Sequence, residues 1–389
     1  MSPGPSVEAL DHSAREALAA PGHHFRVPLG RKKDEIEPVS DEGIKHRVGF
    51  AGTVARAFLR SLSRKYTKRY LARRIVNMLL VLFVVLALNF ILPRLMPGNF
   101  IQIFVQSLER EHPGANVQVI SQRIEALYGI NLPYWAQFLH YIQQIISFTP
   151  NFGPSFAYYP TSSWFIVTYA LEWTLILLGT SQAISWVIGI FLGTYMAMHK
   201  DKTVDRVLQP GLYFLNTIPP FWLGLIFILV FAIDLRILPA SGAYQVTPDL
   251  VGVITHMILP TAVIIAVTLP SHALVVRGVT LEVLSSDFVT VSKAQGLRWR
   301  TFYGRVLRNS MLPSLTNLFL SVGFLIGGIF TVEYTFSYPG MGTVIATAIF
   351  NEDYPVIQAS LYVTTLVVLL CNLAADLLYP IVDPRVSYT

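Results

Sequence analysis

The chain has 389 residues, of which 53% are hydrophobic and 13% are charged, and its formal net charge is +6. Soluble domains are about 25% charged, so this composition excludes an ordinary soluble protein. The single cysteine, Cys371, excludes an intramolecular disulfide bond.

Residues 1–53 differ in composition from the rest of the chain. They are rich in proline, glycine and charged residues, and no apolar period is long enough for a helix. Such a segment cannot bury enough apolar surface to offset the entropy of folding. We therefore expect a mostly disordered cytoplasmic extension. It is not a secretory signal, because no apolar stretch with a cleavage site follows a short basic start.

Residues 54–74 carry apolar side chains at helical spacing with basic residues between them. This pattern predicts an amphipathic helix that lies on the inner leaflet and contacts anionic lipid. A specific regulatory partner for this helix is the alternative interpretation.

Six largely uncharged runs dominate the remainder. About 20 apolar residues are needed to cross the hydrocarbon layer as a helix, and each run reaches or nearly reaches that length. Continuous apolar blocks also disfavour a β-barrel, whose strands are short and alternate. The sequence therefore predicts an all-α integral membrane protein with six transmembrane helices, at residues 75–93, 173–198, 207–233, 250–276, 309–332 and 354–375.

The basic residues alternate between the connecting segments. Residues 55–74 contain eight lysines and arginines and no acid, and further bases follow the second and fourth runs. Because basic loops stay on the cytoplasmic side, both termini are predicted to be cytoplasmic. The same topology explains the positive charge better than a nucleic-acid surface does, so no nucleic-acid partner is expected.

The outer loop at residues 94–164 is too long for a simple turn. Residues 117–127 and 134–148 within it show helical spacing of apolar residues. A docking platform for a partner from outside and a lid over the helix ends are both compatible with this pattern.

Motifs for enzymatic chemistry are missing from the sequence. There is no Gly-x-x-x-x-Gly-Lys-[Ser/Thr], no His-Glu-x-x-His and no Cys/His cluster with metal-ligand spacing. The predicted spans contain only His256 and His272 as candidate proton carriers, and interfacial positions at the helix ends are the favoured interpretation of both. We therefore expect a transport subunit that is not an enzyme, binds no cofactor or metal, and draws energy from elsewhere.

The most informative segment is polar and basic and lies between the fourth and fifth runs. A helix Asp287–Ala294, a tight turn at Gly296 and a second helix from Arg298 are predicted, because glycine adopts positive φ without a Cβ penalty. Ala294 and Gly296 would let a partner approach the backbone, with Leu297, Trp299 and Phe302 as apolar anchors among arginines. An amphipathic hairpin contacting lipid headgroups is the alternative.

Several motifs in this chain resemble those of bacterial ABC importer permeases. Ser292-Lys-Ala-Gln-Gly-Leu297, followed by Arg305-Val-Leu-Arg-Asn-Ser-Met-Leu-Pro313, is similar to their cytoplasmic loop, and it is closest to the dipeptide/oligopeptide and nickel group. Val332-Glu-Tyr-Thr-Phe-Ser-Tyr-Pro-Gly-Met-Gly342, Leu95-Met-Pro-Gly98 and Asp383-Pro-Arg385 agree with that group. The resemblance extends over residues 70–388, and it departs from the wider pattern where Ser-Lys-Ala replaces Glu-Ala-Ala.

The resemblance implies a permease domain at residues 75–389 with a cytoplasmic coupling loop at residues 277–308. Two cytoplasmic ATP-binding subunits would bind this loop and use the ATP, and Pro219, Pro220, Pro260 and Pro270 would kink helices in the moving part. The residues implied in coupling are Asp287, Lys293, Ala294, Gly296, Leu297, Arg298 and Trp299. An outer pore loop is implied at Glu333, Pro339, Gly340, Gly342 and Asp353.

The resemblance further implies a second homologous permease and an extracytoplasmic substrate-binding protein as partners, in the bacterial cytoplasmic (inner) membrane. Peptides are the implied cargo, and nickel, glutathione and oligosaccharides are the alternatives within the same group. A stand-alone channel or secondary carrier is the alternative from another class.

Overall fold

The computed structural model describes residues 68–95, 122, 132–146, 150–243 and 249–382. Within these ranges the chain is helical, without a strand, and a single antiparallel bridge joins Pro154 to Ser162. Residues 1–67, and with them the predicted extension and most of the predicted interfacial helix at residues 54–74, lie outside the described part.

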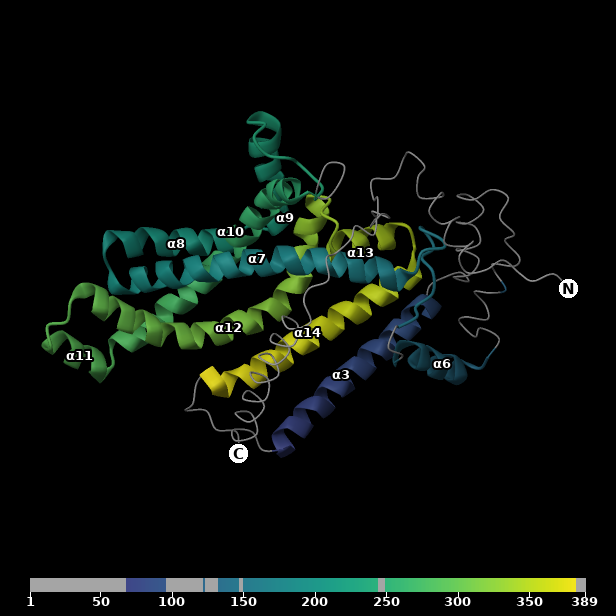
Figure 1. The fold of residues 1–389 in the computed structure, drawn as a ribbon, viewed down its shortest axis with the longest axis horizontal. Coiled ribbons are helices and arrows are strands. Elements are labelled where there is room, and N and C mark those ends of the chain that lie inside the picture. The colour runs from purple at the N-terminus through teal and green to yellow at the C-terminus, as the bar shows by residue number, and fades with distance from the viewer. Residues whose placement is uncertain (1–67, 96–121, 123–131, 147–149, 244–248, 383–389) are drawn as a thin grey trace, which may run out of the picture.

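The long helices run side by side in one elongated bundle (Figure 1). Their backbone groups bond within each helix, which is the arrangement that a bilayer demands of a spanning segment. α7 and α10 form the most extensive contact, α12 packs against both, and α14 packs against α12 and carries α3 on its other side. The bundle helices are α3 (Lys68–Leu95), α7 (Ser163–Met198), α8 (Thr203–Thr217), α10 (Leu250–Leu284), α12 (Trp299–Thr335) and α14 (Tyr354–Val382).

Four described helical stretches are long and apolar enough to cross a membrane, and they are Ala72–Ile91, Ser163–Met198, Leu250–Leu284 and Tyr354–Asp376. They coincide with the first, second, fourth and sixth predicted runs. The all-α membrane class is thus confirmed for the described residues. The fifth run, residues 309–332, lies within the continuous α12. The total of six spans and the cytoplasmic placement of the termini stay predictions.

The kink expected at Pro219 and Pro220 within the predicted span at residues 207–233 is confirmed, and it breaks the run rather than merely bending it. The run is divided into α8, α9 (Pro220–Phe227) and a π-helical turn, η1 (Ile228–Asp234), with a bend of 99° between α8 and the α9–η1 unit. Ile218 and Pro219 are both extended, with ψ of 125° and 132°. A residue that precedes a proline avoids the α conformation, and two adjacent prolines impose this on two residues in succession.

The isolated prolines of the fourth span behave differently. Pro260 and Pro270 lie inside the continuous α10, so the kinks expected at these two residues do not interrupt the helix. Neighbouring helices and side chains can satisfy the backbone groups that a proline leaves unpaired within a membrane.

α7 and α10 approach each other at two glycines of α7. A Cβ atom on Gly189 would lie 2.7 Å from the Cβ atom of His272, and one on Gly193 would lie 2.3 Å from the carbonyl oxygen of Ala273. Small residues at such positions allow helix backbones to meet closely. The two helices therefore pack backbone to backbone at the level of Ala273.

A short polar seam accompanies this contact. The ring Nε2 of His272 lies 2.9 Å from Oε1 of Gln182, and the hydroxyl of Thr268 donates to that of Ser185 at 2.8 Å. His272 is 2% exposed and His256 is 8% exposed. Both histidines are therefore buried among neighbouring side chains, and their placement at the membrane interface stays a prediction.

An ion pair ties α8 to α10 near the same end of the bundle. Nε and Nη2 of Arg277 each donate to a different carboxylate oxygen of Asp205 at 2.7 Å. The backbone N–H of Asp201 donates to the same carboxylate at 3.2 Å. The Asp205 side chain is 3% exposed, and a bidentate arginine–carboxylate pair fixes geometry as well as charge.

We expect Gly193→Ala to loosen the bundle. The added methyl group meets the Ala273 carbonyl, and overpacking of this kind costs roughly 1–3 kcal/mol of stability. Gly179→Ala is the matched control in the same helix, since no atom lies within 4 Å of the position that its methyl group would take. Thermal unfolding in detergent should show a lower midpoint for the first variant alone. Equal midpoints would contradict the close α7–α10 contact.

Candidate functional site

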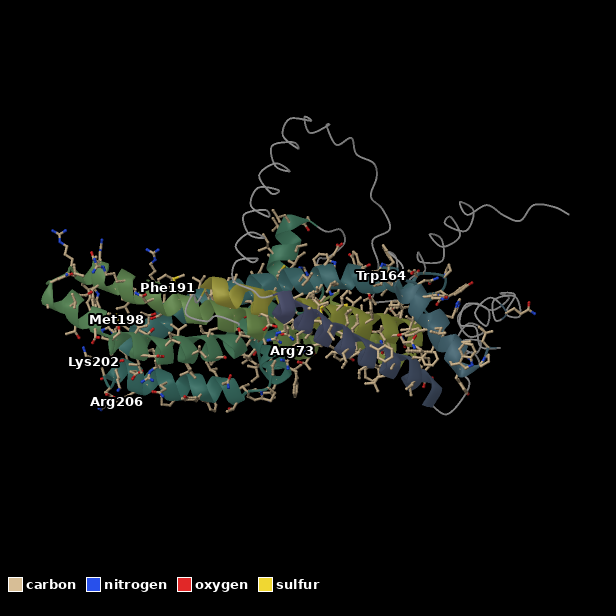
Figure 2. The ribbon with its side chains drawn as sticks, turned by 90° about the horizontal axis from the view of Figure 1, so that it is seen from below. Arg73, Trp164, Phe191, Met198, Lys202 and Arg206 are labelled. Carbon is tan, nitrogen blue, oxygen red and sulfur yellow. The ribbon has the colours of Figure 1, made fainter. Side chains whose placement is uncertain are left out.

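The two groups of residues singled out in the sequence lie at opposite ends of the bundle. Met198, Lys202 and Arg206 gather at one end, and Trp164 lies toward the other (Figure 2). α11 (Asp287–Ala294) lies at the first end and α13 (Met341–Phe350) at the second (Figure 1). Any function that involves both groups must therefore act along the length of the helices.

The first group forms a helical hairpin, which we call the α11 hairpin: α11, residues 295–298 and the first turns of α12. Gly296 has a φ of +63°, and α12 begins at Trp299 after Arg298 as its N-cap. The predicted helix, turn and second helix are thus confirmed. The predicted loop start at residue 277 lies within α10, which continues to Leu284.

One face of the α11 hairpin is buried against the helix ends. Val289, Phe302 and Val306 are 1%, 8% and 0% exposed, and they pack with Met198 and Leu284. The hairpin therefore rests on the ends of α7 and α10. Phe302 lies one turn before Val306 in α12, and both side chains are buried against Val289 of α11. The prediction that Phe302 anchors a partner is therefore wrong.

The other face of the hairpin is open. Ala294, Gly296 and Arg298 are exposed, Leu297 is half-buried, and Trp299 is 59% exposed. No atom lies within 4 Å of the position of a Cβ on Gly296. Glycine is therefore needed there for the positive φ, while none of the described residues fills the space in front of it.

The remaining residues of the predicted coupling set lie on α11 itself. Asp287 is exposed in its first turn. Lys293 belongs to the same helix, and its side chain lies outside the described part.

The second group forms a tight turn between α12 and α13, which we call the α12–α13 turn (residues 333–342). Glu333 is fully buried, and its Oε2 accepts a hydrogen bond of 2.6 Å from the backbone N–H of Gly342. Its backbone carbonyl accepts another from Tyr338 at 2.8 Å. A carboxylate suits the first turn of α13, where helix N–H groups lack partners.

The glycines of this turn are required by close approach rather than by positive φ. A Cβ on Gly340 would lie 2.4 Å from the Glu333 carboxylate, and one on Gly342 would lie 2.4 Å from the backbone of Phe330. Gly340 and Gly342 are thus glycines because the Glu333 carboxylate and the Phe330 backbone leave no room for a Cβ atom. Pro339 is half-buried between the buried Tyr338 and Gly340.

Asp353 joins residues 155–157, which precede α7, to the first turn of α14. It is 1% exposed, and its Oδ2 accepts hydrogen bonds from the Ser155 hydroxyl and from the backbone N–H of Ala157, the latter at 3.2 Å. Its Oδ1 lies 3.4 Å from the backbone N–H of Val356 in the first turn of α14. Burial raises the pKa of Asp353, and these donors oppose that rise.

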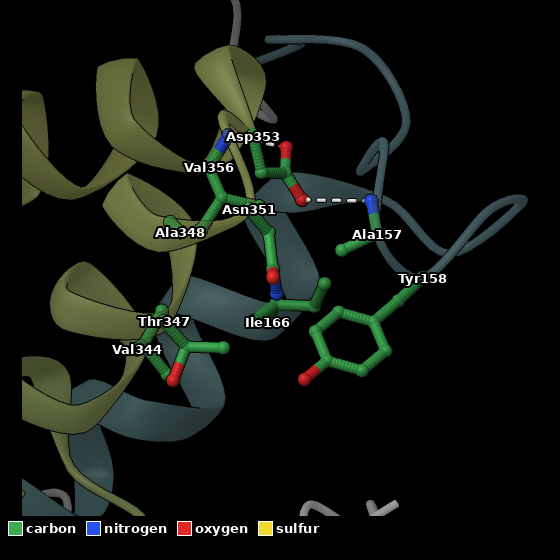
Figure 3. Close-up of a pocket in the computed structure, with 9 residues that line it drawn as sticks. All are labelled: Ala157, Tyr158, Ile166, Val344, Thr347, Ala348, Asn351, Asp353 and Val356. Carbon is green, nitrogen blue, oxygen red and sulfur yellow. Dashed lines mark hydrogen bonds between the residues drawn. The ribbon is translucent and has the colours of Figure 1, made fainter. Parts of the chain in front are cut away.

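The pocket beside Asp353 is small (Figure 3). Tyr158, Ile166 and Asn351 help to line it, and its volume of about 10 Å³ holds about one water molecule. Both Glu333 and Asp353 therefore shape this end of the bundle through buried hydrogen bonds.

Three buried polar pairs were not foreseen from the sequence. Arg277 contributed only to the predicted topology, and Asp205 was not considered, although it is one of two acids, with Asp201, among Lys200, Lys202 and Arg206. The Gln182–His272 and Ser155–Asp353 pairs join residues 90 and 198 positions apart. No local pattern indicates such pairs.

Comparisons with known proteins agree with this architecture. Residues 189–388 match the family described as the inner membrane component of binding-protein-dependent transport systems. The chain belongs to this family. It is a transport permease with several membrane helices, and the family resemblance predicted from its motifs is confirmed.

Individual relatives extend the match beyond the family model. A probable peptide ABC transporter permease of Sinorhizobium fredii is 32% identical over 301 residues, covering 77% of this chain and 93% of the relative. An oligopeptide permease of Bacillus subtilis is 30% identical over 304 residues, covering 77% and 93%. A glutathione permease of Salmonella typhimurium is 31% identical over 304 residues, covering 78% and 93%.

We expect Asp353→Asn to destabilise this end of the permease. An amide cannot present two acceptor oxygens, so at least one buried donor loses its partner at a cost of roughly 1–3 kcal/mol. Glu352→Gln is the matched control, because Glu352 is exposed next to Asp353. Thermal unfolding and limited proteolysis near residues 150–162 should distinguish the two variants. Equal behaviour would show that the Asp353 hydrogen bonds carry no stability.

Proposed function

We propose that this permease forms half of the translocation pore of an ATP-driven importer of peptides. Relatives named for peptide and oligopeptide transport, at about 30% identity over almost their whole length, support this cargo. The relative named for glutathione transport supports a second candidate, glutathione, which is itself a small peptide.

The observation that carries the proposal is the two-faced α11 hairpin. Its buried face fixes it to the ends of α7 and α10, and its open face presents a glycine turn with an exposed tryptophan and arginine. Tryptophan and arginine are enriched among residues that dominate protein interfaces. Such a hairpin suits two cytoplasmic ATP-binding subunits, each of which binds one permease and uses the ATP.

The helices that leave the hairpin offer a route for the movement. α10 leads into α11, and α12 leads away from it and ends at the α12–α13 turn. ATP binding shifts the permease between inward-facing and outward-facing states only if it stabilises one state more than the other. When the ATP-binding subunits close, a hairpin packed onto helix ends would move those helices with it. Closure would thereby favour one of the two states of the permease over the other.

The remaining partners complete the proposed assembly. A second, homologous permease would close the pore within the bacterial inner membrane. An extracytoplasmic binding protein would deliver the cargo to the end of the bundle that carries α13. The outer pore loop at Glu333, Pro339, Gly340, Gly342 and Asp353 would then be a rigid rim, because its buried hydrogen bonds leave it little freedom.

We expect Gly296→Trp to abolish ATP-dependent uptake while membrane insertion stays normal. The new side chain would occupy the space in front of the turn, which the described part of the chain leaves open. Gly296→Asn is the matched control, since asparagine tolerates positive φ and is small. The measurement is uptake of a labelled peptide by proteoliposomes that contain the assembled transporter, together with copurification of the ATP-binding subunits.

Normal uptake by the Gly296→Trp variant would contradict a partner contact at this turn. Equal loss in the Gly296→Asn variant would show that backbone conformation, rather than contact, is what uptake requires. The purified chain alone in liposomes should transport nothing, whereas a stand-alone channel or carrier would transport without partners.

A further inference from the structure

A groove of about 150 Å³ opens between α3 and α14, away from the α11 hairpin and the α12–α13 turn. Its lining residues recur every three or four positions on each helix, so each helix contributes one stripe. The residues are Arg74, Asn77, Met78 and Val81 on α3 and Leu369, Asn372, Leu373 and Asp376 on α14.

The polarity of the groove changes steadily along its length. At one end Nη2 of Arg74 donates to Oδ1 of Asp376 at 2.8 Å. The amides of Asn77 and Asn372 come next, beside the apolar side chains of Met78 and Leu373, and Val81 and Leu369 form the far end. Seven residues of α-helix separate Arg74 from Val81, a rise of about 10 Å.

A phospholipid has the same order of groups over a similar length. Its charged headgroup is followed by ester groups, which accept hydrogen bonds, and then by acyl chains. The amides of Asn77 and Asn372 have no hydrogen-bond partner among the described residues. An amide without a partner is costly at membrane depth, and an ester carbonyl would be a suitable acceptor.

The position of the groove makes it accessible to lipid. The spanning part of α3 is only 17% buried within this chain, and the Arg74 side chain is 43% exposed. On the predicted topology, the Arg74 end lies at the cytoplasmic leaflet, where α3 emerges from a basic segment.

We propose that this groove binds one phospholipid of the cytoplasmic leaflet whose headgroup carries both a phosphate and a primary ammonium. The Arg74 guanidinium takes the phosphate, because its planar donors match phosphate oxygens. The Asp376 carboxylate takes the ammonium. A headgroup with negative charge alone would meet repulsion from Asp376, and a quaternary ammonium would have no N–H to donate. The bound lipid joins α3 to α14.

This inference does not depend on the cargo or on the ATP-binding partners. Its test uses the assembled transporter, purified in mild detergent and titrated with phosphatidylethanolamine, phosphatidylglycerol or phosphatidylcholine before native mass spectrometry. Wild-type transporter should retain about one phosphatidylethanolamine per copy of this chain, roughly tenfold more readily than the other two lipids, as expected when one charge-assisted hydrogen bond is gained.

Two double variants separate the contribution of the Arg74–Asp376 pair from that of the Asn77 and Asn372 amides. Arg74→Gln with Asp376→Asn removes both charges while keeping polar side chains, and it should bring phosphatidylethanolamine down to the level of the other lipids. Asn77→Leu with Asn372→Leu keeps the ion pair, fills the groove and should lower retention of all three lipids. Leu370→Ala, next to the lining residue Leu369 but outside the groove, is the control and should bind as the wild type does.

Thermal unfolding of each variant checks that the complex is folded. Equal retention of the three lipids by the wild type would overturn the proposal. So would unchanged phosphatidylethanolamine binding in both double variants.

Discussion

The backbone contact between α7 and α10 is the constraint on which the rest of the structure depends. Gly193 brings α7 against the backbone of Ala273 and Arg277, and Arg277 is the residue that holds Asp205 of α8. One helical turn beyond Gly193, Met198 contributes to the buried face of the α11 hairpin. At its other end α7 meets the α12–α13 turn, because Thr174 accepts a hydrogen bond from the N–H of Met341 at 2.8 Å. α7 therefore connects both ends of the molecule.

Three buried carboxylates fix neighbouring segments of this frame through hydrogen bonds. Asp205 is held by a guanidinium, Glu333 by the first turn of α13, and Asp353 by the Ser155 hydroxyl and two backbone N–H groups. Asp205 and Asp353 join segments that are far apart in the chain, and Glu333 closes the turn between α12 and α13. Because a buried charge is costly unless it is hydrogen-bonded, each also specifies one arrangement of its neighbours.

The sequence predicted what depends on local pattern and missed what depends on distant pairing. Apolar run length was sufficient to locate four spans, and small residues among arginines were sufficient to locate the α11 hairpin. The break after α8 follows from two adjacent prolines, whereas single prolines in α10 cause none, and run length alone cannot make that distinction. The burial of His272 and Phe302 depends on helices brought together by tertiary packing. Ser155 and Asp353 are 198 positions apart, and no periodicity relates them.

The groove beside α3 follows from the way α3 is held against its neighbours. Among the described elements, α3 makes its principal contacts with α14 and α6 (Tyr134–Ile146), and two polar clamps hold it to α14. Near one end Asn89 and Gln358 exchange side-chain-to-carbonyl hydrogen bonds of 3.1 and 2.9 Å, and at the other end Arg74 pairs with Asp376. Polar bonds are directional and strong in a low dielectric, so the clamps fix the spacing of the helices at both ends. Beside the Arg74 clamp, the side chains of α3 and α14 are too small to fill the distance between the two helices, and the groove remains. Since a bilayer leaves no such space empty, the gap is completed by a component of the membrane, and the polarity of its walls selects which one.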